Sequence, residues 1–237
     1  MTGWLRQLQN EVIDFFFPRE CIGCGKVGDF ICVQCSKKLS RLNPPFCLRC
    51  GKPESSGTFC HECWGKSNSL DSIRSVFVFD GILREAVLSF KYRNLRAIAN
   101  CLGEFMASYY KVNSLSGDIL VPVPLNEKRI RDRGYNQSGL LAREISMSIG
   151  VPVSEKVIRR TRDCQPQART KNVDERRRNM ENAFSHIGDG VSGMDVVIID
   201  DVCTSGATLE ACAFALKSAG AKRVTGFTLA REIKKQE

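Results

Sequence analysis

The strongest constraint on this 237-residue chain is a short N-terminal stretch that holds eight of its 12 cysteines. They form four pairs, each with two residues between the cysteines: Cys21/Cys24, Cys32/Cys35, Cys47/Cys50 and Cys60/Cys63. This spacing lets one tight turn aim both sulfur atoms at one ion, and two turns complete the tetrahedral four-sulfur shell that Zn²⁺ accepts. The pairs therefore predict two structural zinc ions, because a closed shell leaves no open position for catalysis.

Disulfides, an iron–sulfur cluster and thioredoxin-like redox pairs are the alternatives for these cysteines. A redox pair is single and attached to a βαβ unit, whereas here four pairs repeat in close succession. The spacing leaves open which pairs share an ion. We favour the first pair with the second and the third with the fourth, and a crossed arrangement is the alternative.

The first 17 residues carry apolar side chains at nearly helical spacing, and Pro18 ends the pattern. We therefore expect residues 1–70 to form an N-terminal apolar helix with a double zinc-finger module, and residues 71–237 to form a second domain. No apolar run approaches the roughly 18 residues of a membrane span. We expect no membrane span and a cytoplasmic protein, where reducing conditions favour metal sites over disulfides.

The remainder of the chain alternates between apolar runs and helical patterns. The expected strands are Val76–Phe79, Ile119–Val123, Val151–Val157, Val196–Ile199 and Arg223–Leu229. The expected helices are Ile82–Tyr92, Ala97–Tyr110, Gln137–Ile149 and Ala207–Ala219. Strands that alternate with helices predict an α/β fold with a mainly parallel sheet flanked by helices, and ligands bind such sheets at the carboxyl ends of the strands.

The most informative segment is the apolar run Val196–Ile199 together with the polar turn that follows it. Asp200 and Asp201 stand at the carboxyl end of the run, and Thr204-Ser205-Gly206-Ala207-Thr208 then opens a helix. The N–H groups and hydroxyls of such a turn can surround a phosphate, and the helix N-terminus adds its positive dipole end. The two carboxylates can accept hydrogen bonds from sugar hydroxyls or help to hold Mg²⁺ through water.

This segment resembles the 5-phosphoribosyl-1-pyrophosphate (PRPP) signature of type I phosphoribosyltransferases. The resemblance implies that Asp200 and Asp201 hold the ribose hydroxyls, and that the 5-phosphate lies in the turn formed by Thr204, Ser205, Gly206, Ala207 and Thr208. It also implies a type I phosphoribosyltransferase-like fold, with PRPP as ligand or substrate and Mg²⁺ as its companion ion.

Further motifs resemble the ComF family in the same order along the chain. They are Phe90-Lys91-Tyr92-Arg93, Val121-Pro-Val-Pro-Leu, Arg133-Gly134-Tyr135-Asn136-Gln137, Arg159-Arg160-Thr161, Gln165-Pro166-Gln167 and Arg177-Arg178-Asn179. Members of that family also begin with an apolar helix and a module of four cysteine pairs. The resemblance implies that Lys91 is a further phosphate contact.

Basic residues gather in one region of the second domain. Between positions 128 and 178 the chain has 14 Lys and Arg residues against 6 Asp and Glu residues, within a formal net charge of +9 for the whole chain. Arg129, Arg131 and Arg133 are candidates to neutralise a pyrophosphate or to bind single-stranded DNA, and residues 159–178 to form a hood over the site. Tyr135 is a candidate for stacking on a base, with core packing as the alternative.

The resemblance to the ComF family implies a role in natural competence, in which transforming single-stranded DNA is taken up and handled. PRPP, single-stranded DNA and a helicase-like competence protein are the implied partners. The alternative is an active phosphoribosyltransferase of nucleotide or cofactor metabolism. The sequence supplies a PRPP-like donor site but names neither an acceptor nor a catalytic residue.

Overall fold

The computed structural model describes residues 19–65, 68–161, 183–187 and 190–233. The expected N-terminal helix and most of the expected hood lie outside the described residues. The elements are α2 (Val33–Ser36), β1 (Ser72–Val78), α3 (Gly81–Tyr92), α4 (Ile98–Val112), β2 (Ile119–Pro122), α5 (Glu127–Arg133), α6 (Gln137–Ile149), β3 (Ile158–Arg160), β4 (Phe184–His186), β5 (Asp195–Cys203), α8 (Ala207–Ser218) and β6 (Arg223–Arg231).

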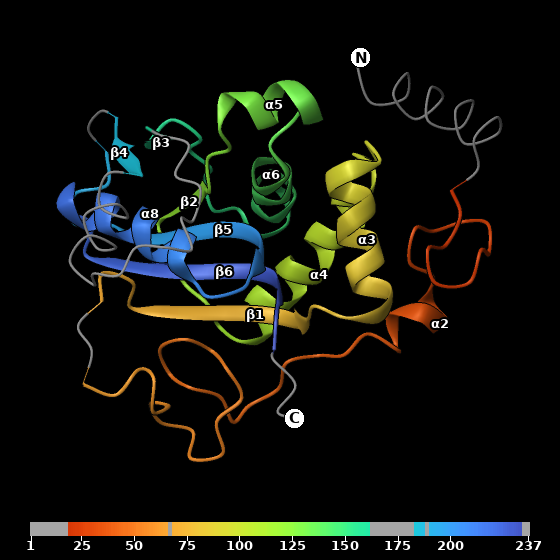
Figure 1. The fold of residues 1–237 in the computed structure, drawn as a ribbon, viewed down its shortest axis with the longest axis horizontal. Helices are drawn as coiled ribbons and strands as arrows, with labels where there is room; N and C mark the ends of the chain where they lie inside the picture. The colour runs from red at the N-terminus through yellow and green to blue at the C-terminus, as the bar shows by residue number, and fades with distance from the viewer. Residues whose placement is uncertain (1–18, 66–67, 162–182, 188–189, 234–237) are drawn as a thin grey trace, which may run out of the picture.

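The centre of the fold is a four-stranded sheet in the order β1-β6-β5-β2 (Figure 1). All three strand pairs are parallel, as the alternation of strands and helices predicts. The inner strand β5 contains the apolar run Val196–Ile199, whose four side chains are at most 1% exposed. A run that is apolar at every position suits a strand with both faces covered, so this sequence can occupy only the interior of the sheet.

Helices cover the two faces of the sheet in two separate core clusters. Val197 and Ile199 of β5 belong to the cluster that includes buried residues of α3, α4 and α6. Val196 and Ile198 belong to the cluster formed with α8, β3 and β4. Alternate side chains of a strand point to opposite faces, so this single run anchors both helical layers. The expected α/β fold of mainly parallel strands flanked by helices is confirmed.

The cysteine-rich segment lies along the outer edge of β1 (Figure 1). The N–H of Leu42 donates to the Val76 carbonyl at 3.0 Å, and the N–H of Val78 donates to the Ser40 carbonyl at 2.8 Å. Further along β1, the N–H of Ile73 donates to the Arg49 carbonyl at 2.6 Å. An exposed strand edge carries unpaired backbone groups, and these bonds satisfy several of those on β1.

The same segment also contributes side chains to the core of the sheet. Cys21, Ile31, Cys35 and Leu39 are each at most 8% exposed and belong to the cluster with α3, α4 and α6. The division of the chain near residue 70 therefore stays a prediction, because residues on both sides of it share one apolar core.

Several expected elements differ from the structure. In the expected strand Val151–Val157, only Val153 makes a bridge, to Leu120 of β2, and the backbone pairs again at β3. Strand β3 pairs antiparallel with β4, 26 residues away at the Arg159–Ser185 pair, in a second small sheet. Cys32, the first residue of the second cysteine pair, is the N-cap of the short helix α2. Among the described residues, no helix combines the length and hydropathy that crossing a membrane requires.

The edge bonds of β1 give a testable prediction. Removal of zinc with a chelator should release the segment 40–49, so the amides of Ile73 and Val78 should exchange with solvent at least about tenfold faster. The peptide that covers Val196–Ile199 is the control, because its amides lie inside the sheet. Hydrogen exchange measured by mass spectrometry tests this, and equal protection of the β1 peptide with and without zinc would contradict it.

Candidate metal centres and phosphate-binding site

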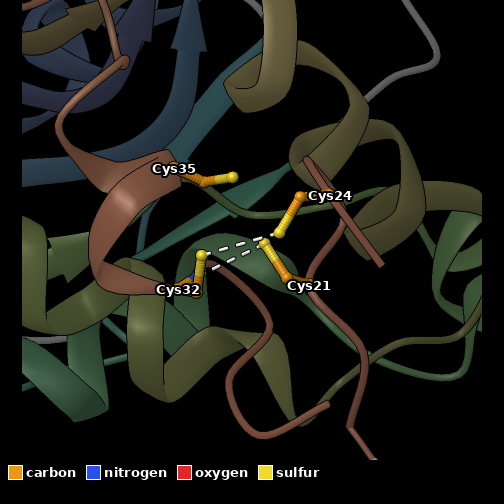
Figure 2. A group of neighbouring side chains, drawn as sticks. All are labelled: Cys21, Cys24, Cys32 and Cys35. Atoms are coloured by element: carbon orange, nitrogen blue, oxygen red, sulfur yellow. Dashed lines mark hydrogen bonds between the residues drawn. The ribbon is translucent and has the colours of Figure 1, made fainter. Parts of the chain in front are cut away.

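The sulfur atoms of the first two cysteine pairs converge on one point. The Sγ atoms of Cys21, Cys24, Cys32 and Cys35 all lie within 4.8 Å of one another, and Figure 2 shows the side chains turned toward a common centre. Cys24 Sγ and Cys32 Sγ are 3.7 Å apart. Tetrahedral zinc with Zn–S bonds near 2.3 Å requires neighbouring sulfurs about 3.8 Å apart, so this group fits the ion.

The third and fourth pairs repeat the arrangement. Cys47, Cys50, Cys60 and Cys63 form the second group within the same 4.8 Å limit, and Cys50 Sγ lies 3.7 Å from Cys60 Sγ. The pairs therefore assemble sequentially, as we favoured, and not in the crossed arrangement.

Backbone geometry explains why the two groups are alike. The N–H of Cys32 donates to Cys21 Sγ, and the N–H of Cys60 donates to Cys47 Sγ, each at 3.3 Å. Burial raises the pKa of the Cys21 and Cys47 thiols, but the backbone N–H donors outweigh it and lower each to about 6. Each group thus contains a thiol that becomes a thiolate, the form that binds metal, near neutral pH.

The polar turn after β5 is exposed and starts α8. Gly206 is the N-cap of α8 and has φ 83° and ψ 0°, a left-handed conformation that favours glycine. Thr204, Ser205, Ala207 and Thr208 are exposed. Within the described part of the chain, no acceptor contacts the N–H groups of Thr204, Ser205 and Gly206. These N–H groups are therefore available to an anion bound at the start of α8.

Asp200 lies at the end of the apolar run of β5, next to the N-terminal turn of α6. The hydroxyl of Ser138 in α6 donates to Asp200 Oδ1 at 2.8 Å, and the N–H of Asp201 donates to the same atom at 2.9 Å. Burial, followed by the neighbouring Asp201 carboxylate, raises the pKa of Asp200 to about 7. Asp200 therefore changes its charge close to neutral pH.

Asp201 is 2% exposed. Its Oδ2 atom forms an ion pair with Lys91 Nζ of α3 at 2.9 Å, but it has no hydrogen-bond partner among the described residues. Lys91, expected as a phosphate contact, is thus placed beside the acidic pair. Its charge compensates Asp201, because a buried carboxylate without a cation would cost several kcal/mol.

The turn at Gly206 packs against β1, the strand that the cysteine-rich segment holds. A Cβ atom added at Gly206 would lie only 3.2 Å from Ile73 Cδ1, so the turn lies directly on the Ile73 side chain. The backbone of Ile73 also meets the second cysteine group, because a Cβ added at Gly51 would lie 2.5 Å from the Ile73 carbonyl oxygen. One residue of β1 thus contacts both sites.

Tyr135 does not fit its expected role as an exposed platform for a base. Its side chain is 8% exposed, and its hydroxyl donates to the Phe90 carbonyl. The Phe90 ring lies 5.7 Å away between centroids, and the Arg96 guanidinium lies 4.7 Å from the Tyr135 ring centroid. The alternative, core packing, describes this residue.

The three candidate arginines lie on α5, a helix without buried residues. Arg129 and Arg131 are exposed, and Arg131 forms a long ion pair with Glu127 at 3.7 Å. Arg133 donates to Gln137 Oε1, and its guanidinium lies 5.5 Å from the Tyr92 ring centroid. No described contact joins these three side chains to the turn at Gly206.

Two residues of this region were missing from the sequence-based candidates. Ser138 contacts Asp200, and the signal for it was a hydroxyl residue just inside the predicted helix Gln137–Ile149. Tyr92 is 72% exposed beside Arg133 and was named only as part of a motif. Its exposure depends on where α3 ends relative to α5, which the local sequence does not reveal.

The chain matches two family models, which fall on these two sites. Residues 12–64 match the model described as a double zinc ribbon domain. Residues 130–237 match the model described as a phosphoribosyl transferase domain.

Curated relatives match along most of the chain. The competence protein ComFC of Bacillus subtilis (strain 168) is 31% identical over 215 residues, which cover 87% of this chain and 86% of the relative. The chain belongs to the ComF family. Competence protein F of Haemophilus influenzae is 28% identical and covers 91% of this chain and 98% of itself. The DNA utilization protein YhgH of Escherichia coli (strain K12) is 29% identical, with 86% and 91% covered.

Solved structures that resemble this ComF-family chain share low sequence identity with it. One is a glutamine PRPP amidotransferase from B. subtilis, at 20% identity and a TM-score of 0.41, which covers 56% of this chain and 26% of its own. Another is a purine phosphoribosyltransferase from Pyrococcus horikoshii, at 19% identity and a TM-score of 0.33, with 56% and 81% covered.

This ComF-family chain has two four-cysteine zinc-binding sites. The match to a double zinc ribbon domain and the two convergent sulfur groups both support them. With four sulfurs in each shell, the zinc ions fix the backbone of the module and leave no position for a reacting water.

Zinc content tests the sequential pairing. Metal analysis should find two zinc ions per chain. The double variant Cys24→Ser/Cys32→Ser removes ligands from one site and should keep one ion. The double variant Cys24→Ser/Cys50→Ser removes a ligand from each site and should lose both. If Cys24→Ser/Cys32→Ser loses both ions while Cys24→Ser/Cys50→Ser keeps one, the pairs are crossed.

The raised pKa of Asp200 predicts a pH-dependent stability. The folded chain holds the Asp200 proton more tightly than the unfolded chain, whose aspartate has a pKa near 3.8. The stabilising contribution is therefore complete below about pH 4 and is lost as the pH rises through about 7. Relative to Asp200→Asn, the free energy of unfolding of the natural chain should fall by at least about 1 kcal/mol between pH 5 and pH 8.

Urea unfolding of both proteins without Mg²⁺ or phosphate measures this difference. The zinc sites are the same in both proteins, so any effect of pH on zinc cancels in the comparison. A difference that stays constant from pH 5 to pH 8 would show that Asp200 has an ordinary pKa.

Proposed function

We propose that this ComF-family chain binds PRPP together with Mg²⁺ and acts in natural competence, in the uptake and handling of transforming single-stranded DNA. The observation that carries the PRPP part is the polar turn at Gly206 beside the acidic pair at the carboxyl end of β5. The match of residues 130–237 to a phosphoribosyl transferase domain supports it.

The phosphate end of the ligand would lie in the turn formed by residues 204–208. Three backbone N–H groups there have no acceptor among the described residues, and the hydroxyls of Thr204, Ser205 and Thr208 are exposed beside them. A 5-phosphate would accept hydrogen bonds from these groups at the positive end of α8. Gly206 provides the left-handed backbone conformation that this turn has at the start of α8.

The ribose hydroxyls would donate to the two carboxylates. Lys91 forms an ion pair with Asp201, and Ser138 donates to Asp200, so both side chains have fixed directions. Oxygen donors of this kind suit Mg²⁺, and Asp201 Oδ2 has no hydrogen-bond partner among the described residues. When bound, Mg²⁺ would neutralise part of the pyrophosphate charge.

The competence part of the proposal rests on the relatives and on charge. The curated relatives are named competence proteins in B. subtilis and H. influenzae, and a DNA utilization protein in E. coli. Helix α5 presents Arg129 and Arg131 to solvent and carries the half-buried Arg133, and such cations bind the phosphates of a single strand. A helicase-like competence protein remains a proposed partner, with the zinc module as the docking candidate.

Calorimetric titration tests the ligand. We expect Mg²⁺–PRPP to bind the natural chain, and Asp200→Asn and Asp201→Asn each to weaken binding by at least about tenfold, because each removes a charged acceptor. Asp80→Asn is the matched control. Asp80 is exposed at the start of α3 and makes no side-chain capping bond there.

Binding that survives both substitutions would reject the acidic pair as the ribose site. Absence of binding to the natural chain, at ligand concentrations up to the millimolar range, would reject the PRPP proposal as a whole. Zinc content measured on each variant shows that the module is intact.

Turnover as a phosphoribosyltransferase is the second candidate. The favouring observation is the same donor site, since a bound Mg²⁺–PRPP would present C1 of its ribose to a nucleophile. Release of pyrophosphate in the presence of candidate acceptors, including nucleobases and DNA, distinguishes an enzyme from a protein that only binds PRPP.

A further inference from the structure

Tyr92 is an exposed aromatic residue that directly follows Lys91, the ion-pair partner of Asp201. It is the last residue of α3, and 72% of its side-chain surface is accessible to solvent. The guanidinium of Arg133 lies 5.5 Å from the ring centroid, so the arginine approaches the ring but leaves most of it open. An open aromatic ring with a cation beside it is suited to stacking on a nucleobase.

Contacts between the ends of two helices hold this ring in place. Arg96 follows α3 and donates to the carbonyl of Gly134 at 3.1 Å, directly after α5. Arg133, at the last position of α5, also donates to Gln137 Oε1 in α6. The end of α3 and the end of α5 therefore form one surface, which we call the Tyr92 surface. It comprises Tyr92, Arg93, Arg96, Arg129, Arg131 and Arg133.

The Tyr92 surface carries five arginines, and all its residues except Arg133 are exposed. Glu127 and Asp132 of α5 are its acidic neighbours, so the local balance stays positive. Arg129 and Arg133 are four residues apart on one helix, which separates their backbones by about 6 Å along the axis. Cations spread over this length can contact more than one phosphate, which favours a strand over a single nucleotide.

We propose that Tyr92 is a stacking platform for a base of single-stranded DNA, with the arginines of α5 binding the adjacent phosphates. The proposal deepens the competence function proposed above and rests on it. A base must be unpaired to lie flat on a side-chain ring, so the surface selects a single strand over a duplex. The buried Tyr135 thus has an exposed counterpart in the same basic region.

The position of Tyr92 joins this platform to the acidic pair. Lys91 precedes it in α3 and forms the ion pair with Asp201. The Tyr92 surface is therefore joined through the next residue of α3 to the acidic pair, and Tyr92 itself contacts neither carboxylate in the described contacts.

Fluorescence anisotropy with a labelled 20-nucleotide oligo(dT) tests the proposal on the zinc-loaded full chain. Tyr92→Ala should weaken binding by roughly 5- to 150-fold, the range for loss of one stacked base. Tyr92→Phe keeps the ring and should bind within about twofold of the natural chain. Met147→Ala is the matched control, because Met147 is equally exposed at 73% and lies outside the Tyr92 surface.

Salt dependence separates stacking from charge. Tyr92→Ala removes no phosphate contact, so the slope of log K against log salt concentration should not change. Arg129→Ala should reduce that slope by about 0.7, the value for one phosphate contact on a single strand. Unchanged affinity in Tyr92→Ala, or equally weak binding by Tyr92→Phe and Tyr92→Ala, would overturn the stacking role.

Two further arms separate this proposal from the PRPP site and from a free nucleotide. Mg²⁺–PRPP should bind Tyr92→Ala with the same affinity as it binds the natural chain. If only Asp201→Asn loses PRPP binding, that result does not contradict the stacking role of Tyr92. Absence of oligo(dT) binding to the natural chain would reject the platform while the PRPP site stands. Binding of dTMP that depends on Tyr92, without binding of oligo(dT), would assign the ring to a nucleotide and overturn the single-strand proposal.

Discussion

Strand β1 needs hydrogen-bond partners on both edges, and distant parts of the chain supply them. Strand β6 pairs with one edge, and the cysteine-rich segment donates to and accepts from the other at Ser40, Leu42 and Arg49. These edge contacts hold the cysteine-rich segment where its side chains join the apolar core of the sheet. They also hold Ile73 where its side chain meets the turn at Gly206. The zinc sites are therefore part of the frame of the sheet, although they take no part in chemistry.

The acidic pair shows how two adjacent carboxylates are kept different. Asp200 meets Ser138 of α6, while Asp201 meets Lys91 of α3. A hydroxyl stabilises charge weakly and a lysine stabilises it strongly. Burial and the neighbouring Asp201 carboxylate raise the pKa of Asp200 to about 7, against the hydrogen bond from Ser138, while Asp201 is held beside a cation. The difference between the two residues therefore comes from burial, from their mutual repulsion and from the groups that the neighbouring helices place beside them.

Sequence reasoning succeeded where the signal was local and failed where it depended on packing. The run Val196–Ile199 and the helix after Gly206 could be predicted because apolar continuity, glycine and hydroxyl residues act over a few positions. Helix α5 was missed because its sequence offers Ile130 as its lone large apolar side chain, so no apolar face marks it. The sequence left open whether Tyr135 stacks on a base or packs in the core and did not single out Tyr92, because burial of a ring is decided by helices that meet it from elsewhere in the chain. The pairing of β3 with β4 has the same cause, since short strands far apart in sequence carry no periodic pattern.

The strand order has a consequence for how the chain is made. Strand β1 has β6 as its partner within the sheet, about 150 residues later at the Ser72–Thr225 pair. During synthesis β1 leaves the ribosome long before β6 exists, and contacts between such distant segments form slowly. The segment around Ser40 and Leu42 is already present at that stage, because it precedes β1. The cysteine-rich module can thus cover one edge of β1 in the nascent chain, while the other edge stays unpaired until β6 has been synthesised.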